Sequence, residues 1–420
     1  MATGRAPVAP QLVRRPAAPA RRTRWDEEAE RVLAGADGFV RVLGGPGTGK
    51  TTLLAELAAD RILNGGVDPE QLLVLTASRR AAADVRTRIT GLLTGTETLR
   101  TVREPLVRTV HSYAFSVLRI QAMLHGEPGP RLLSGPEQDA VIRELLEGDI
   151  EFGAKYWPER LRPALAVPGF AEELRDLILR AAERGLGPED LITLGHEQDR
   201  DEWVAAGRFG QQYEQVTLLL GSSDSAIAHT SAPALDAAEL VASAVLAFET
   251  DDELLAAERA RVRYLLVDDA QHLDPLQYRL LRTLGSAAKE FVVAGDPDQA
   301  IFSFRGADPR ILRDADPGGG TVLLTAGQRM APAIRRAVSH LAARLPGAGQ
   351  RRVDKSRDEG GTVLVRLHAS SAAEASWVAD QLRRAHLLDG VPWSEMAVLV
   401  RSATRSLPVL HRALAASGVP

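Results

Sequence analysis

A glycine-rich segment of eight residues, 44 to 51, constrains the fold of this chain more than any other feature. It reads Gly-Gly-Pro-Gly-Thr-Gly-Lys-Thr, which fits the pattern G-x-x-x-x-G-K-[ST]. An apolar run, Phe39 to Leu43, precedes it, and a helical pattern begins near Thr51. A strand, a glycine loop and a helix in this order predict a phosphate-binding loop, because glycines let backbone N–H groups curve around phosphate oxygens. A glycine-rich turn that binds nothing is the alternative, and the flanking strand and helix argue against it.

The residues of this loop have separate predicted roles in binding a nucleoside triphosphate. Lys50 is expected to reach the β and γ phosphate oxygens, and the hydroxyl of Thr51 is expected to ligate Mg²⁺. We therefore predict ATP and Mg²⁺ as cofactors. The predicted nucleotide-binding residues are Gly44, Gly45, Pro46, Gly47, Thr48, Gly49, Lys50, Thr51 and Thr52.

Two adjacent carboxylates, Asp268 and Asp269, follow a second apolar run, Tyr264 to Val267. A phosphate-binding loop of this kind needs an acidic magnesium ligand at the end of a neighbouring strand, and Asp268 is the candidate. Paired carboxylates after a strand can also form only a turn and a helix cap. The glycine loop upstream favours the metal site, shared by Thr51 and Asp268.

Short apolar runs that alternate with helical stretches predict an α/β fold with a parallel sheet covered by helices on both faces. The predicted strands are 39–43, 72–76, 264–267 and 291–294 in a first domain, and 321–325, 362–366 and 397–400 in a second. Between them the chain is rich in Glu, Leu, Ala and Arg, which predicts a helical insertion. The predicted segments are a disordered basic tail (1–24), a first domain in two parts (25–121 and 257–316), the insertion (122–256) and part of a second α/β domain (317–420).

The composition narrows the range of possible functions. The net charge is -4, so the chain as a whole does not attract nucleic acid, and any nucleic-acid contact must come from a local groove. The absence of cysteine excludes disulfides, thiolate metal sites and a cysteine nucleophile. The nine histidines are scattered without a plausible ligand spacing, so no zinc site is expected. No apolar run approaches the length of a membrane span, so we expect a cytoplasmic protein without a membrane partner.

Three further segments carry a resemblance to a known family. Residues 76–82 (T-A-S-R-R-A-A) are similar to T-F-T-N-K-A-A, and residues 109–112 (T-V-H-S) are similar to T-F-H-S. Residues 295–308 resemble G-D-x-D-Q-S-I-Y-x-[FW]-R-G-A. In this order the motifs resemble the UvrD/Rep/PcrA family of superfamily 1 DNA helicases, from about Trp25 to Pro420. The resemblance implies P-loop, RecA-like domains, and the insertion corresponds to the family's subdomain 1B.

The resemblance also implies roles for individual residues. Gln299 would sense the γ-phosphate, and Phe304 would stack on a DNA base. Without the resemblance, Phe302 and Phe304 are more typical of core residues, because side chains two positions apart on one strand share a face. Arg329 would contact the γ-phosphate from the second domain. Hydrolysis would then move the two domains relative to each other and move the single-stranded DNA along them. The implied catalytic residues are Lys50, Asp268, Asp269, Gln299 and Arg329, and the implied DNA contacts are Thr76, Arg80, His111, Ser112, Phe304 and Arg305.

Four departures from the family pattern concern nucleotide handling. The adenine-reading glutamine falls on Ala29 or Glu28, and the arginine that usually follows the P-loop Lys-Thr is Thr52. The tyrosine before the family's N-Y-R-S arginine is Gln328, and the catalytic glutamate is Asp269, which is one methylene shorter. Both sides of the adenine clamp are therefore predicted to be lost, and the attacking water to be held less well.

These departures predict a weakened motor subunit beside a stronger helicase-nuclease partner, similar to the AdnA-like subunit of actinobacterial AdnAB. The family often has an aromatic residue at the position of Ala77, so we predict weaker binding of DNA. The expected substrates are single-stranded DNA and duplex–single-strand junctions in repair or recombination, with 3′–5′ type translocation. The family's arginine finger lies beyond the motifs found here, so we expect this chain to bind ATP but hardly hydrolyse it. Alternatives are a nucleotide-gated regulator without translocation and a non-enzymatic scaffold that binds DNA and a partner.

Overall fold

The computed structural model of the chain describes residues 23–35, 37–94, 106–223, 233–313, 320–345, 355–356 and 360–420. They fall into two compact units, which divide between Glu359 and Gly360. All but two residues of the predicted basic tail, 1–24, lie outside the described residues. No helix in these ranges is long and apolar enough to cross a membrane.

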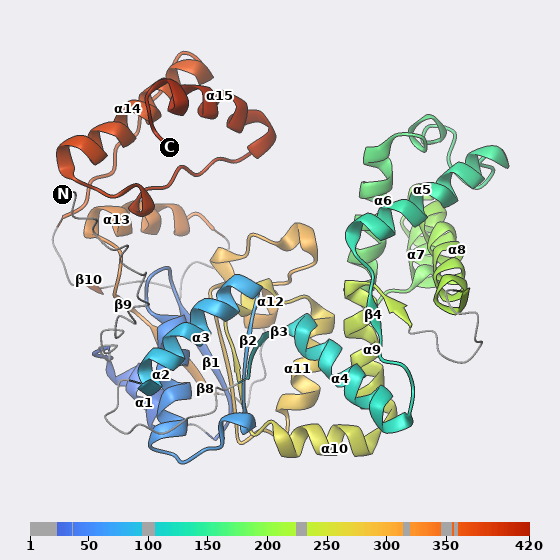
Figure 1. Cartoon of the computed structure of the whole chain (residues 1–420), viewed down its shortest axis with the longest axis horizontal. Helices are drawn as coiled ribbons and strands as arrows, with labels where there is room; N and C mark the ends of the chain where they lie inside the picture. Colours follow the sequence, from blue (N-terminus) through green and yellow to red (C-terminus); the bar gives the residue numbers. More distant parts are fainter. Residues whose placement is uncertain are drawn as a thin grey trace, which may run out of the picture. The chain divides into compact units, whose positions relative to one another are not determined.

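The first unit is built on a parallel sheet of six strands in the order β3-β2-β6-β7-β1-β8 (Figure 1). The four strands predicted for the first domain are confirmed, and β3 was not predicted as a strand. The strands are β1 (Gly38–Gly44), β2 (Leu72–Thr76), β3 (Leu106–Thr109), β6 (Tyr264–Val267), β7 (Glu290–Gly295) and β8 (Gly320–Leu324). This sheet confirms the predicted α/β fold class.

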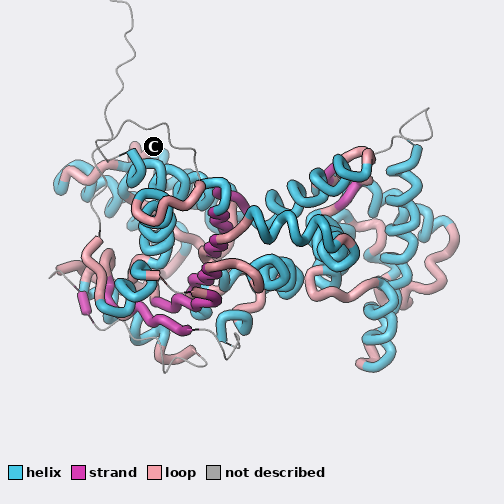
Figure 2. The backbone as a smooth tube through the Cα atoms, turned by 90° about the horizontal axis from the view of Figure 1, so that it is seen from below, coloured by secondary structure: helices cyan, strands magenta, loops and turns pink. Residues whose placement is uncertain are grey.

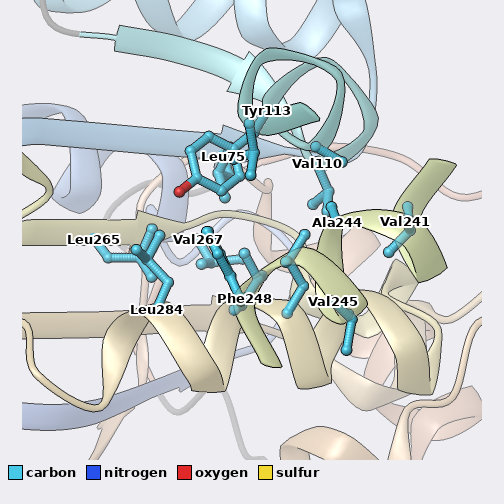
Figure 3. Close-up of a cluster of buried hydrophobic side chains, with 14 of the residues drawn as sticks. Leu75, Val110, Tyr113, Val241, Ala244, Val245, Phe248, Leu265, Val267 and Leu284 are labelled. Carbon is cyan, nitrogen blue, oxygen red and sulfur yellow. The ribbon is translucent and has the colours of Figure 1, made fainter. Parts of the chain in front are cut away.

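Helices cover both faces of the sheet because successive side chains of each buried strand point in opposite directions. Leu72 and Val74 pack against α1 (Glu27–Ala34), α2 (Lys50–Leu63) and α3 (Arg79–Thr94). Leu73 and Leu75 face the opposite core, part of which is drawn in Figure 3. That core is closed by α4 (Val110–His125), α9 (Ala237–Thr250), α10 (Asp252–Arg261) and α11 (Pro275–Gly285).

The helical insertion has a separate hydrophobic core around Trp157 and Phe209. Its main helices are α5 (Gly135–Glu151), α6 (Pro168–Ala182), α7 (Pro188–Glu197) and α8 (Asp201–Ser223), drawn as cyan tubes in Figure 2. The short strands β4 (Arg131–Leu132) and β5 (Ala234–Leu235) pair with each other. Within the predicted range 122–256, α9 and α10 bury apolar side chains in the core of the sheet.

The strand expected at 321–325 to open the second domain lies in the first sheet. As β8, it pairs with β1, with Val40 opposite Gly320 and Gly44 opposite Leu324. The strand expected to open the second domain therefore joins the first sheet, because apolar residues indicate a strand but not the sheet to which it belongs. After β8 come β9 (Ala326–Gly327), which pairs with β10 (Lys355–Ser356), and α13 (Pro332–Ala342).

The second unit contains two helices that pack together, α14 (Ser371–Asp389) and α15 (Ala403–Ala416). The strands predicted at 362–366 and 397–400 are wrong, since neither segment forms a strand in the part of the chain described. An extended segment becomes a strand only when a neighbour takes up its backbone hydrogen bonds. Val365 and Leu399 are accordingly exposed.

Candidate nucleotide site and nucleic-acid surface

The glycine loop runs from the end of β1 to the start of α2, which is the context that its sequence predicted. Gly47 and Gly49 have left-handed backbone conformations, with φ angles of 75° and 97°, which residues with a Cβ atom adopt at a cost. The hydroxyl of Thr48 donates to the carbonyl oxygen of Gly45 at 2.8 Å and closes the turn. The loop is thereby held open toward the N-terminus of α2, where backbone N–H groups attract anions.

The ammonium group of Lys50 lies inside this loop. Lys50 is only 8% exposed, and its Nζ donates to the carbonyl oxygens of Gly44 at 2.8 Å and Gly45 at 3.3 Å. Burial lowers the pKa of Lys50, while the nearby carboxylates of Asp296, Asp269 and Asp268 act to raise it. A phosphate that enters the loop would therefore compete with two carbonyl oxygens for this cation.

Asp268 follows β6 and points toward the same place. Burial, followed by the charge of Asp269, raises its pKa to about 6, and a hydrogen bond with the Thr51 side chain opposes the rise. Its Oδ1 atom is buried and has no hydrogen-bond partner in the described part of the chain. Mg²⁺ prefers oxygen ligands of this type. Thr51 and Asp268 thus fit the magnesium site that the sequence predicts.

A hydrogen-bonded network ties the ends of β6 and β7 together behind the loop. Gln271 donates through Nε2 to Asp269 Oδ1 at 3.1 Å and accepts through Oε1 from the backbone N–H of Asp296 at 3.0 Å. The amide of Gln299 donates to Asp296 Oδ2 at 2.7 Å. Asp269 itself has a left-handed backbone with φ of 53°. Gln271 and Asp296 were not predicted as site residues, although Asp296 lies inside the family-like segment 295–308.

Arg329 lies beside the glycine loop, within the first unit rather than the second domain in which it was expected. A Cβ atom at Gly47 would be 3.5 Å from the Cβ of Arg329, and the backbone N–H of Gln328 donates to the carbonyl oxygen of Gly47 at 2.8 Å. The charge of Arg329 also acts to lower the pKa of Lys50. The structure therefore brings together Lys50, Asp268, Asp269 and Arg329.

The positions expected to read adenine do not present an amide to the loop. Ala29 is fully buried in the core between α1 and the sheet, and Glu28 forms an ion pair with Arg31 on the outside of α1. Two other residues, which the sequence did not point to, lie next to the loop. The indole of Trp25 packs against Gly49, and the guanidinium of Arg88 donates to the hydroxyl of Thr52.

A groove of about 810 Å³ lies between α3, β3 and α4 on the face where DNA contacts were predicted. His111 and Ser112, two of the predicted DNA contacts, line this groove. Burial lowers the pKa of His111, which favours its neutral form. Thr76 is buried and donates to the carbonyl oxygen of Ser78 at 3.0 Å, and Arg80 does not line the groove. The groove is also lined by three arginines that were not predicted as site residues, Arg79, Arg86 and Arg108.

The segment that follows Gln299 exposes an aromatic ring. Phe304 is 68% exposed, and the guanidinium of Arg305 lies 5.4 Å from its ring centre. Phe302 is partly buried, with its ring centre 4.7 Å from that of His272. The sequence predicted that the two phenylalanines lie on one face of a strand. They do not, because residues 303–305 form a single turn of 3-10 helix. Of the two, Phe304 is the ring available for stacking.

Comparison with known proteins agrees with this arrangement. Residues 25–317 match the UvrD/REP helicase N-terminal domain. ATP-dependent DNA helicase UvrD2 of Mycobacterium tuberculosis is 28% identical over 404 residues, which cover 94% of this chain and 54% of that protein. ATP-dependent DNA helicase Rep of Salmonella typhimurium is 26% identical over 370 residues, or 87% of this chain and 50% of Rep. The chain spans about half the length of the curated relatives it matches.

The matched domain covers well over half of the chain and contains the glycine loop, the acidic pair after β6 and the segment with Phe304. On these grounds the chain belongs to the UvrD/REP helicase family.

Proposed function

We propose that this chain binds and hydrolyses ATP to drive movement along single-stranded DNA, as part of a DNA helicase. The observation that carries the proposal is the buried Lys50 ammonium among Asp268, Asp269 and Asp296, with one Asp268 oxygen left unpaired in the described chain. A cluster of buried charges around an anion-binding loop is costly for a purely structural region. It suits a site that awaits a triphosphate and a divalent cation.

The residues of the site then have distinct tasks. Lys50 leaves the carbonyl oxygens of Gly44 and Gly45 and turns to the phosphates. Thr51 and Asp268 would hold Mg²⁺, which when bound would neutralise charge on the phosphate oxygens. Asp269 orients the attacking water, and its own orientation is set by the hydrogen bond from Gln271.

The chain after β7 offers a physical link between the nucleotide and the DNA. Gln299 lies in a 3-10 turn, Pro297–Gln299, and Phe304 lies in the next one, Ser303–Arg305. A change at Gln299 caused by the γ-phosphate is therefore only a few residues away from the exposed ring that would stack on a base. Together with the groove lined by His111, this segment supports single-stranded DNA as the substrate. We propose duplex–single-strand junctions and 3′–5′ type translocation from the family resemblance alone.

We further propose that this motor is an auxiliary one, like the AdnA-like subunit of a helicase-nuclease, acting in DNA repair or recombination in the cytoplasm. The shorter carboxylate of Asp269 supports slow hydrolysis, because a misplaced general base loses about 100-fold in rate per 1 Å. A stronger partner subunit would then supply most of the work. A scaffold that binds DNA and a partner without using ATP is the competing function.

The test is Mg²⁺-dependent ATP binding and hydrolysis with and without single-stranded DNA. Lys50→Ala should abolish ATP binding, and single-stranded DNA should raise the low hydrolysis rate of the unaltered chain. Lys155→Ala, an exposed lysine of the insertion, is the matched control and should change neither quantity. Equal binding and hydrolysis in Lys50→Ala and the unaltered chain would favour the scaffold.

A further inference from the structure

We propose that Glu183, which caps the C-terminal end of α6 in the helical insertion, is a positioning residue for Phe304, the exposed ring assigned to stacking on a DNA base. The inference rests on the proposed function and adds the residue through which the insertion controls the strength of DNA binding. Glu183 belongs to none of the segments that resemble the helicase motifs.

Glu183 packs directly against the segment that carries Phe304. Gly306, two residues after the ring, has a left-handed backbone with φ of 83°. A Cβ atom at Gly306 would lie 2.9 Å from Cδ of Glu183 and 3.3 Å from its Cβ, so the carboxyl group occupies the space that a side chain would fill. Glycine leaves that space open and adopts this conformation without strain. The carboxyl group of Glu183 therefore supports the turn Ser303–Arg305 from the side of the insertion.

Three segments that are distant in sequence meet at this point and hold one another. The backbone N–H of Leu276, in the first turn of α11, donates to the carbonyl oxygen of Glu183 at 3.3 Å. The backbone N–H of Asp308 donates to the carbonyl oxygen of Leu273 at 2.8 Å. The packing of Glu183 on Gly306 joins the remaining pair of segments. The insertion, the chain after the acidic pair and the chain after Phe304 thus form a closed set of contacts.

The carboxyl group of Glu183 lies where its ionised form is unfavourable. Its side chain is only 15% exposed. Burial raises the pKa of Glu183 to about 8, the charge of Arg180 opposes this rise, and the charge of Asp274 adds to it. Arg180 Nη1 lies 2.9 Å from Glu183 Oε2, but the pair lacks hydrogen-bond geometry, and neither atom has a hydrogen-bond partner among the described residues. The carboxyl group is therefore mainly neutral at pH 7 and mainly charged at pH 9.

Charged residues of several elements surround this carboxyl group. They are Arg180 and Arg184 at the end of α6, Asp236 before α9 and Asp274 before α11. In the segment that carries Phe304, the guanidinium of Arg305 lies over the phenylalanine rings, and Asp308 pairs with Arg310. An ionised Glu183 is thus repelled by two aspartates while it lies against uncharged backbone at Gly306. Ionisation should therefore loosen the support of Phe304.

The experiment measures the affinity of the whole chain for a fluorescent single-stranded oligonucleotide by anisotropy, and for ADP with Mg²⁺ by calorimetry. Glu183→Ala should weaken DNA binding at pH 7 by at least about fivefold, the loss expected when one stacked base is displaced, and leave ADP binding unchanged. Glu173→Ala, which removes an exposed carboxylate of the same helix, is the matched control and should change neither affinity. In a chain that already carries Phe304→Ala, Glu183→Ala should have little further effect, because residues that act through one another are not additive.

A pH series with Glu183→Gln separates the charge of the carboxyl group from its shape. The unaltered chain should lose DNA affinity between pH 7 and 9 as Glu183 ionises. Glu183→Gln has a side chain of the same size that stays neutral, so it should retain at pH 9 the affinity that it has at pH 7. The same loss of affinity in both proteins would contradict the inference, since a residue that only fills space has no such dependence on its own charge.

The outcomes separate this inference from the proposed function. If Glu183→Ala binds DNA as well as Glu173→Ala does, Glu183 does not position Phe304 and the inference is wrong, while the proposed function stands. If Glu183→Ala weakens ADP as much as DNA, or adds its full effect to that of Phe304→Ala, the contact is merely structural and the inference is again wrong. If the unaltered chain does not bind DNA, the proposed function fails and the inference fails with it.

Discussion

Replacing Asp268 with asparagine should stabilise the protein without ligands while removing its response to Mg²⁺. Burial raises the pKa of this carboxyl from its ordinary 3.8 to about 6, so the folded state binds the proton more tightly than the unfolded state does. The cost of ionising Asp268 is absent below pH 3.8, grows between pH 3.8 and 6, and is complete above pH 6. A shift of this size corresponds to about 3 kcal/mol of unfolding free energy at neutral pH.

The amide introduced by Asp268→Asn would avoid that cost and could still accept the hydrogen bond from Thr51, so the substitution isolates the charge. Thermal unfolding at pH 8 should show a midpoint raised by roughly 5 to 10 °C for the first unit, and at pH 4 the two proteins should differ little. Mg²⁺ with ADP should raise the midpoint of the unaltered chain and leave that of Asp268→Asn almost unchanged. A lower midpoint for Asp268→Asn at pH 8, or an undiminished response to Mg²⁺, would refute the reasoning.

Three other substitutions test separate parts of the site. Phe304→Ala should weaken single-stranded DNA binding by about 1 to 3 kcal/mol in fluorescence anisotropy. Phe152→Ala, which removes another exposed ring, should not weaken it. Equal affinities for the two variants would exclude Phe304 from the DNA path. Asp269→Glu should raise the ATP hydrolysis rate by up to about 100-fold, because the added methylene closes the gap to the water; an unchanged or lower rate would show that reach does not limit hydrolysis. Arg329→Ala should weaken a non-hydrolysable ATP analogue more than ADP in calorimetry, because a contact with the γ-phosphate exists only in the triphosphate; equal losses would place Arg329 elsewhere.

The central strands could be predicted from sequence because their side chains are buried on both faces. Residues 72–75 and 264–267 are continuously apolar, and the structure confirms the strands predicted at 72–76 and 264–267 as β2 and β6. The phosphate loop could be predicted as well, since its glycines and Lys50 are adjacent in sequence. Local patterns of this kind need no knowledge of what packs against them.

Strand partnership could not be predicted, because it depends on distant parts of the chain. The apolar residues of β8 would suit either an edge of the first sheet or the start of a second, and only pairing with β1 decides between them. Residues 397–400 have a strand-like composition but no strand neighbour among the described residues. Composition therefore indicated a strand at β8 but not its partner, and it indicated a strand at 397–400 that does not form.

Two contacts beside the glycine loop escaped prediction for the same reason. Arg88 is separated from Thr52 by 36 positions, and it reaches Thr52 only because α3 packs on α2. Trp25 looks like an ordinary core residue in the sequence, since nothing local shows that Gly49 leaves room for its ring. Contacts between separate helices carry no periodic signal in a single sequence.

The most direct test of the account is whether the nucleotide site and the DNA surface influence each other. The affinity of the chain for a fluorescent single-stranded oligonucleotide should be measured without nucleotide, with Mg²⁺ and ADP, and with Mg²⁺ and a non-hydrolysable ATP analogue. We predict that the triphosphate changes the affinity by at least about fivefold, as expected for two coupled sites, and that Lys50→Ala removes the change. The same affinity in all three conditions for the unaltered chain would contradict the claim that this is a motor.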